Sequence, residues 1–246
     1  MRKYLKSDLI RVFSNYKIYI AIIIVAFILN MGIEDRRADI KSVLGAFQVI
    51  VISKYMIVVY TVCAAVYAGA LVDELENGYI KYQVMRGSLG EYIIAKVTAV
   101  FIASVVTILA GAVLFIFVNS MLMPLTDLAC FEETYVQYAF LYNGKFILLW
   151  FAIWGIKVGV MIGMLALSAM VTSMFTTNKM LVFAMPALIY ELLLELSTEL
   201  NIFNFAWFNI NWPNDDVVEK IRGILFTIIC IVLMSKIIVY KLKRRM

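Results

Sequence analysis

Histidine is absent from this chain of 246 residues. Its absence excludes a Ser-His-Asp triad and any metal site built on imidazole. Cysteine is scarce: Cys63 and Cys230 lie inside apolar runs, and Cys130 lies in a loop. No matched pair indicates a disulfide, so we expect free thiols. The sequence also lacks a Gly-x-x-x-x-Gly-Lys-Ser/Thr motif and with it the phosphate-binding loop of P-loop ATPases.

Charge is scarce as well, with 16% charged and 64% hydrophobic residues. Soluble domains have about 25% charged and about 45–50% apolar residues, and a soluble fold of this length has too little interior for the excess. A membrane-spanning helix needs about 20 mostly apolar residues. Six stretches qualify, at 18–33, 43–72, 91–118, 145–172, 179–200 and 221–240. We therefore predict an all-α membrane protein with six transmembrane helices in a single domain, 1–246.

The distribution of lysine and arginine predicts the orientation of the spans. Six spans place both termini on one side, together with the loops around 73–91 and 173–179. Lysine and arginine outnumber acidic residues on that side, whereas acidic residues predominate on the other. By the positive-inside rule, both termini are cytoplasmic.

The N-terminal segment, 1–17, has the pattern of an amphipathic helix. Leu5, Leu9 and Val12 recur at helical spacing, and basic residues supply the opposite face. Such a helix lies in the headgroup layer of the cytoplasmic leaflet. It is either a simple topology anchor or an elbow helix that moves with the first span.

The loop at 73–91 carries most of the polar sequence between the second and third spans. It begins with acidic residues, breaks at Gly78, continues through a short apolar and basic stretch, and breaks again at Gly87 and Gly90. Glycine interrupts helices, so we predict a short cytoplasmic helix bounded by these glycines. Such a helix could receive force from a soluble partner; the alternative is an ordinary charged hairpin.

The run Glu74-x-Glu76-x-Gly78, followed by Arg86-Gly-Ser-x-x-x-Tyr92-x-x-x-Lys96, resembles the ABC-2 type exporter permeases. The sequence departs from the common family pattern at Tyr79 and Gly87, where threonine and proline are frequent. The resemblance implies that segment 73–91 is a coupling helix docking on a separate ABC ATPase. Its contact residues would be Glu74, Glu76, Gly78, Tyr79, Tyr82 and Arg86.

The same resemblance implies an assembly of two permeases, either two copies or a copy and a paralogue, with two nucleotide-binding subunits. ATP and Mg would bind to those subunits, so no cofactor is expected on this chain. Small permeases of this layout, resembling peptide or lantibiotic export and immunity permeases, would reside in the bacterial cytoplasmic membrane.

Charged residues inside the apolar runs form a second group of candidates: Lys54, Lys157, Glu191 and Glu195. Each costs about 2.5–3.5 kcal/mol at mid-bilayer on insertion scales, so each is expected to face a partner or water. Glu191 and Glu195 lie one turn apart on one face. We predict that Lys157 or Lys54 pairs with these glutamates. The pairing either fixes helix register or lines a translocation path.

The fourth span contains glycines at every fourth position, Gly155, Gly159 and Gly163. Glycines at this spacing let another helix approach closely, so we interpret them as packing residues. Pro186 lies within the fifth span and is expected to kink it or to free a nearby carbonyl.

The outer loop at 198–220 is rich in aromatic residues, which favour the boundary between membrane and water. They form either an aromatic belt or, as the resemblance implies, short extracellular re-entrant helices that close the outer side. The gate residues would then be Phe205, Trp207, Phe208 and Trp212.

The resemblance implies a permease subunit of an ATP-driven exporter for a hydrophobic or amphipathic substrate, and on the resemblance alone a membrane-active or antimicrobial peptide ranks first. We expect no catalytic residues, no metal and no nucleic-acid partner. The alternative is an ATP-independent ion-coupled carrier or channel that uses the intramembrane lysines and glutamates. An intramembrane enzyme is disfavoured, because no cluster of nucleophile, base and metal ligands is present.

Overall fold

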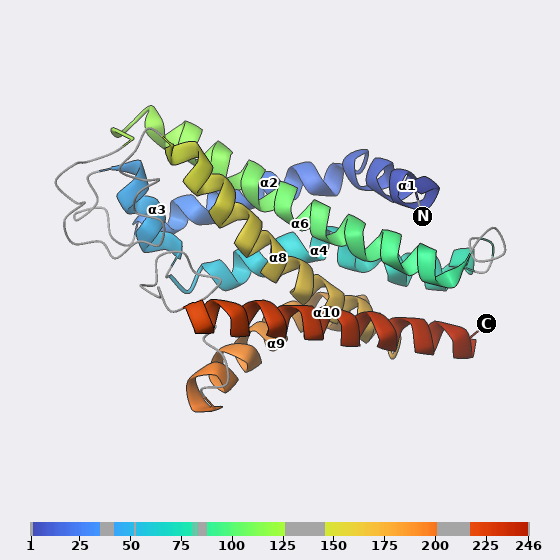
Figure 1. Cartoon of the computed structure of the whole chain (residues 1–246). Helices are drawn as coiled ribbons and strands as arrows, with labels where there is room; N and C mark the ends of the chain where they lie inside the picture. The colour runs from blue at the N-terminus through green and yellow to red at the C-terminus, as the bar shows by residue number, and fades with distance from the viewer. Residues whose placement is uncertain are drawn as a thin grey trace.

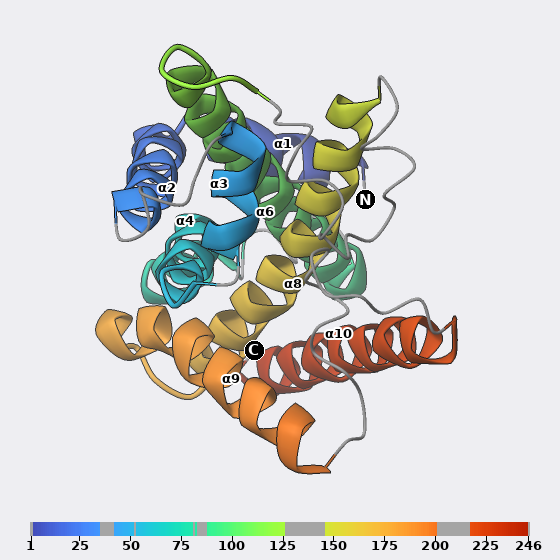
Figure 2. The same ribbon diagram turned by 90° about the vertical axis from the view of Figure 1, so that its left-hand side faces the viewer.

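The computed structural model is a bundle of α-helices. It describes residues 2–34, 42–51, 53–80, 82, 88–125, 146–200 and 217–245, and these ranges contain no strand. The longer helices are stacked side by side (Figures 1 and 2). The first and last helices bring both ends of the chain to the same end of the molecule (Figure 1). An even number of passes through a membrane would give this arrangement.

The described residues up to Glu76 form the helices α1 (Arg2–Phe13), α2 (Tyr16–Glu34), α3 (Val43–Val51) and α4 (Met56–Glu76). The boundary between α1 and α2 is set locally by Asn15. Its side-chain oxygen accepts a hydrogen bond of 3.0 Å from the backbone N–H of Lys17. This is the geometry of a helix N-cap, so α2 begins as a separate helix.

Four more helices follow: α6 (Leu89–Ser120), α8 (Ile147–Ser173), α9 (Lys179–Leu200) and α10 (Val217–Arg245). Ser88 caps α6, because its hydroxyl accepts a hydrogen bond of 3.2 Å from the backbone N–H of Glu91. The core is centred on the contact between α6 and α8, with α2 and α4 packed beside them. α10 lies at the edge of the bundle and leaves much of its apolar surface exposed (Figure 2).

Within the described residues, five helical segments are long and apolar enough to cross a membrane: Tyr16–Ile33, Met56–Glu76, Leu89–Ser120, Leu148–Ser173 and Ile221–Arg244. A membrane-embedded all-helical protein is therefore the correct class. α9 forms a helix over the fifth predicted stretch but does not belong to this set. Its sequence includes three charged residues, Lys179, Glu191 and Glu195, among apolar ones. A sixth crossing by α9 stays a prediction.

The prediction of one continuous span over 43–72 is wrong. The chain forms two helices there, α3 and α4, separated by a turn at Ser53–Tyr55. The hydroxyl of Ser53 donates a hydrogen bond of 2.7 Å to the carbonyl oxygen of Ile50. At about 1.5 Å per residue the nine residues of α3 reach about 13 Å, too short to cross a bilayer.

The break lets α3 fold back against the bundle. Phe47 on α3 is fully buried, and its ring lies 4.6 Å from that of Trp154 and 5.0 Å from that of Phe151 on α8. Aromatic pairs at such distances add about 0.5–1.5 kcal/mol beyond their buried area. The aromatic cluster therefore compensates for ending the helix within an apolar run.

The predicted amphipathic N-terminal helix forms as α1, and it packs against α6. Val12 and Asp8 are buried, at 3% and 6% exposure, whereas Ile10 is exposed. The inner face of α1 is thus covered by protein rather than by lipid headgroups alone. The presence of a buried aspartate on this face leads to the site described below.

Candidate functional site: a buried charge cluster beside an amphipathic cavity

Lys96, on the second turn of α6, is 1% exposed and lies among acidic groups from two other helices. Its ammonium group is 2.8 Å from Oε2 of Glu74 on α4 and donates a hydrogen bond of 2.9 Å to Oε1. Oδ1 of Asp8 on α1 lies 3.5 Å from the same ammonium group. One lysine thus joins the N-terminal helix, the end of α4 and the start of α6.

Two further groups bind Glu74. The guanidinium of Arg11 and the hydroxyl of Tyr92 both donate hydrogen bonds to its carboxylate. Arg11 also lies 5.4 Å from the centre of the Tyr79 ring. Burial lowers the pKa of Arg11, but the charge of Glu74 and its hydrogen bond outweigh that effect and raise the pKa above the usual value. We call Asp8, Arg11, Glu74 and Lys96 the charge cluster.

The charge cluster contains two carboxylates and two cations, so it is neutral overall. Removing charges from water is costly, and the cost is recovered only where each charge keeps well-placed partners. Here Glu74, at 5% exposure, has three donors around it. The arrangement therefore stabilises the docking of α1 only as long as its members stay together.

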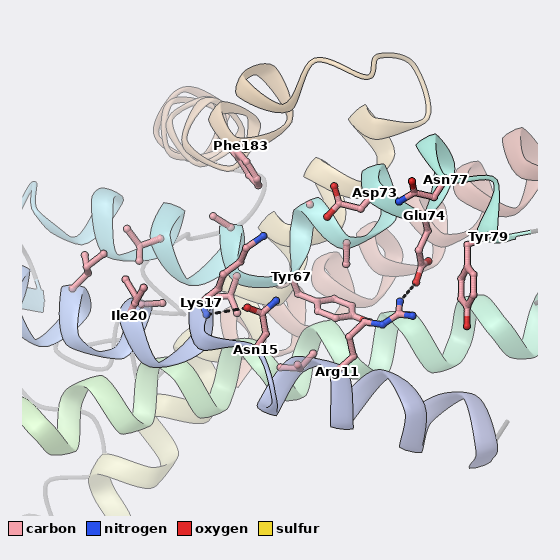
Figure 3. A pocket seen from close by; sticks show the side chains of 18 residues that line it. Arg11, Asn15, Lys17, Ile20, Tyr67, Asp73, Glu74, Asn77, Tyr79 and Phe183 are labelled. Atoms are coloured by element: carbon pink, nitrogen blue, oxygen red, sulfur yellow. Dashed lines mark hydrogen bonds and ion pairs between the residues drawn. The ribbon is translucent and has the colours of Figure 1, made fainter.

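A cavity of about 660 Å³ adjoins the charge cluster between α1, α2, α4 and the start of α9. Arg11, Asn15, Lys17, Asp73, Glu74 and Asn77 line one part of the cavity, while aliphatic residues of α2 and α4 line the other (Figure 3). Phe183 of α9 borders the cavity (Figure 3), where a Cβ added to Gly69 would lie 3.1 Å from its ring. The cavity is therefore amphipathic and within the usual size range of small-molecule sites.

Tyr67 connects the cavity with the charge cluster. It lines the cavity, and its ring lies 5.4 Å from the Lys96 ammonium. Its hydroxyl is buried and completes no hydrogen bond of normal geometry with the described residues, although Asp8 faces it. A buried polar atom without a good partner indicates a position where a water molecule or ligand could bind.

A second ion pair, at the surface, joins α9 to the end of α4. The ammonium of Lys179 lies 2.8 Å from Asp73 and 3.3 Å from Glu76. All three side chains are at least 40% exposed. Water and salt weaken such contacts, so they contribute much less than the buried pairs.

The predicted coupling residues divide into two groups. Glu74 is buried in the charge cluster, so its carboxylate can act on a partner only through Arg11, Tyr92 and Lys96. Glu76, Tyr79 and Tyr82 are exposed. Gly78 has a φ of 65°, a conformation that favours glycine, and the chain changes direction there after the end of α4. Arg86 lies outside the described residues.

The predicted intramembrane charges occupy different surroundings. Lys54 is exposed in the turn between α3 and α4, not inside a span, and its ammonium lies 5.9 Å from the centre of the Tyr55 ring. Lys157 is buried within α8, at 9% exposure, whereas Glu191 and Glu195 are exposed on α9. The pairing of Lys157 with these glutamates stays a prediction.

The glycines of α8 face α6. A Cβ added at Gly155 would lie 2.1 Å from Leu109, at Gly159 2.5 Å from Val105, and at Gly163 2.4 Å from Phe101. These distances are too short for any side chain, so the two helices approach as closely as the glycines allow. The proposed gate residues Phe205, Trp207, Phe208 and Trp212 all lie outside the described residues, as does most of the segment at 198–220.

The charge cluster was not predicted from the sequence: Glu74 was expected to contact a partner, and Lys96 was named only as part of the run that resembles the exporter permeases. One signal was available: Tyr92 and Lys96 lie one turn apart at the start of a long apolar helix, and Asp8 is the only acid in the first helix. In the described part of the chain, no three His, Cys, Asp or Glu residues are placed to hold a metal ion.

Comparisons with family models, with curated proteins and with solved structures gave no match for this chain.

Proposed function

We propose that this chain is the permease subunit of an ATP-driven exporter whose ATPase is a separate chain. Its substrate would be hydrophobic or amphipathic, with a membrane-active peptide ranked first on the sequence resemblance. One observation carries the proposal: α4 lines the amphipathic cavity through residues up to Glu74, and the exposed side chains of Tyr79 and Tyr82 follow directly after its end. A force applied to these side chains would reach the cavity wall directly.

The proposed mechanism is alternating access. A partner that pushes on Glu76, Tyr79 and Tyr82 would displace the end of α4 relative to α2. The charge cluster ties α4 to α1 and α6 at this point, so these ends would move together. The cavity walls contributed by α2 and α4 would then separate or close. Movements of this kind, in which packed helices slide past one another, are common in transport proteins.

The proposal places the chain in the bacterial cytoplasmic membrane with both termini in the cytoplasm. The common location of the two chain ends supports this orientation (Figure 1). An exposed carboxylate on α9, Glu191, and the exposed apolar face of α10 support contact with a second permease copy or a paralogue. A carboxylate facing lipid would be costly, and a neighbouring subunit or an aqueous path would relieve that cost.

Site-specific cross-linking tests the ATPase partner. We would place a photoreactive amino acid at Tyr82, which is 65% exposed, and in parallel at Leu122, which is 74% exposed on the segment after α6. Cross-linked chains from membranes of the native host would be identified by mass spectrometry. We expect a chain with a P-loop ATPase motif at Tyr82 and not at Leu122. Capture at both positions, or at Leu122 only, contradicts the proposed docking surface.

Functional coupling gives an independent test. Glu76→Ala with Tyr79→Ala should abolish substrate-stimulated ATP hydrolysis by the purified complex, because both side chains are exposed on either side of Gly78 at the end of α4. The matched control is Tyr16→Ala, an exposed tyrosine at 68% on α2. Full transport in vesicles without nucleotide would contradict the exporter.

The ion-coupled carrier remains the second candidate, because Lys157 is a buried cation in the middle of a spanning helix. Buried intramembrane charges often belong to ion pathways. Under this hypothesis, transport in ATP-free vesicles would follow an imposed proton or sodium gradient and be lost in Lys157→Met. ATP-dependent transport that is insensitive to uncouplers would exclude it.

A further inference from the structure

The residues that line the cavity and the residues exposed on the nearby surface change from polar to apolar at the same level along α2. Tyr16 and Tyr19, at the start of α2, are exposed at 68% and 57%. From Ile20 onward along α2, the apolar residues Ile20, Ile23 and Phe27 are exposed instead. Tyrosines favour the membrane interface and aliphatic side chains favour the hydrocarbon, so this boundary marks the edge of the bilayer core. Inside the cavity, Asn15 and Lys17 lie on the polar side of that boundary and Ile20 and Ile24 on the apolar side.

The polar part of the cavity has both signs of charge in equal number. Arg11 and Lys17 supply cations, and Asp73 and Glu74 supply carboxylates. Arg11 is bound to Glu74, so neither is fully available to a ligand. Lys17 has no ion pair within the described residues. Asp73 is paired with Lys179 at 2.8 Å through its Oδ1, but its side chain is 47% exposed, so the carboxylate can accept a further donor. A ligand with one phosphate and one ammonium group would complement this lining better than a purely anionic one.

The apolar part of the cavity indicates that the rest of the ligand is hydrophobic. Ile20, Ile24, Val62, Ala65 and Val66 line a continuous side of the cavity, and the two isoleucines are also exposed at the surface of α2. An alkyl chain could therefore enter between α2 and α4 from the bilayer. A soluble zwitterion would leave this surface uncovered, and the volume of about 660 Å³ suits a single small amphiphile.

We propose that the cavity binds one phospholipid with a zwitterionic, primary-amine headgroup, of the phosphatidylethanolamine class. Its phosphate lies at Lys17, its ammonium group at Asp73, and one acyl chain lies along Ile24 and Val66. The buried hydroxyl of Tyr67 and the side chain of Asn15 provide further hydrogen-bonding groups in the lining. The proposal requires only that the chain is embedded in a bilayer, and it does not depend on an ATPase partner.

Native mass spectrometry of the delipidated, detergent-purified chain tests the proposal. The chain would be titrated with phosphatidylethanolamine, phosphatidylcholine and phosphatidylglycerol of identical acyl chains. We expect one tightly bound phosphatidylethanolamine per chain, with about tenfold weaker binding of the other two, which corresponds to about 1.4 kcal/mol. Equal binding of phosphatidylglycerol contradicts the zwitterionic headgroup, and equal binding of phosphatidylcholine contradicts the role of the primary amine.

Variants locate the lipid. Lys17→Gln should weaken phosphatidylethanolamine binding about tenfold, whereas Lys6→Gln removes the same charge from an exposed residue of α1 outside the cavity and should leave binding unchanged. Ala65→Phe should fill the cavity and abolish binding, with Val113→Phe on the exposed face of α6 as its control. Lys17 is exposed, so its variant keeps the test valid if Ala65→Phe fails to fold.

Three results would overturn the proposal: unchanged binding in Lys17→Gln, unchanged binding in folded Ala65→Phe, or displacement of the lipid by an equal concentration of soluble glycerophosphoethanolamine. The third would show that the headgroup alone is recognised. Lipid binding with no associated ATPase would contradict the exporter and leave this inference standing. An associated ATPase with no bound lipid would support the exporter and contradict this inference.

Discussion

Along α6, the residues in the middle of the helix face the glycines of α8, whereas Tyr92 and Lys96 near its start face charged groups of α1 and α4. The first contact contains Phe101, Val105 and Leu109 and depends on shape alone. The second contains buried ions and depends on the pairing of opposite charges. α6 is thus held in the bundle by close packing along its middle and by ion pairs near its start.

The two contacts should respond differently to force. Close packing against glycine resists sliding, because any displacement brings side chains into backbone, and interfaces of this kind behave as rigid units. Charge pairs can change partners as helices shift, provided that each ion keeps one. We therefore regard the α6–α8 contact as the fixed part of the bundle and the charge cluster as the part that can move.

The largest expected effect is from Lys96→Met. This substitution leaves Glu74 with Arg11 and Tyr92 but removes the ion pair of Asp8. Breaking a buried pair costs about 3–5 kcal/mol, so thermal unfolding in detergent should begin at a much lower temperature. Adding Asp8→Asn should restore part of the loss. Lys6→Met, at an exposed position, is the control, and an equal effect in both variants would contradict the charge cluster.

A smaller loss is expected for Gly159→Ala. The new Cβ would lie 2.7 Å from the Cα of Val105, and a backbone atom cannot move without the helix. Overpacking of this kind costs about 1–3 kcal/mol. Gly90→Ala is the matched control, since no atom lies within 4 Å of its added Cβ, and it should be neutral or slightly stabilising. Unfolding at the wild-type temperature in Gly159→Ala would show that the helices are not in close contact.

Asn119→Leu tests the C-terminal end of α6, where a hydrogen bond between neutral side chains, rather than an ion pair, joins α6 to another helix. The amide of Asn119 donates to the side-chain oxygen of Asn30 at 2.8 Å and joins α6 to α2. Hydrogen bonds between membrane helices average about 0.6 kcal/mol and reach about 1.7, so the loss in unfolding free energy should lie in that range. Ser120→Ala, the exposed neighbour, should have no effect. A loss as large as that of Lys96→Met would remove the contrast between ions and neutral groups.

Several helices could be predicted from the sequence because hydropathy alone determines them. The expected stretch at 91–118 lies within α6, and the expected stretch at 145–172 overlaps α8, with differences of two residues or fewer at each end. The break between α3 and α4 could not be predicted, because neither glycine nor proline marks it. Ser53 and Lys54 interrupt the apolar run only briefly, and the break depends on Phe47 packing against the distant residues Phe151 and Trp154.

The charge cluster escaped prediction for a similar reason. Positive residues near the end of a span were assigned to the cytoplasmic surface, and this rule treats Lys96 and Lys81 alike. Only the tertiary contact with α1 shows that Lys96 is buried, since Asp8 covers the lysine from a position far away in the sequence. Short-range patterns identify which residues are apolar, but they do not indicate which ions will be buried together.

The smallest effect is expected for Lys179→Gln, which removes the surface pair between α9 and α4. Its partners, Asp73 and Glu76, are both well exposed, so water already solvates them and the unfolding temperature should not change measurably. Salt distinguishes the two kinds of pair. Raising the ionic strength should screen Lys179 and leave Lys96 unaffected, because buried pairs are screened much less. If Lys179→Gln destabilises the protein as much as Lys96→Met, burial does not govern these ion pairs, and the assignment of a fixed middle and a movable start of α6 is wrong.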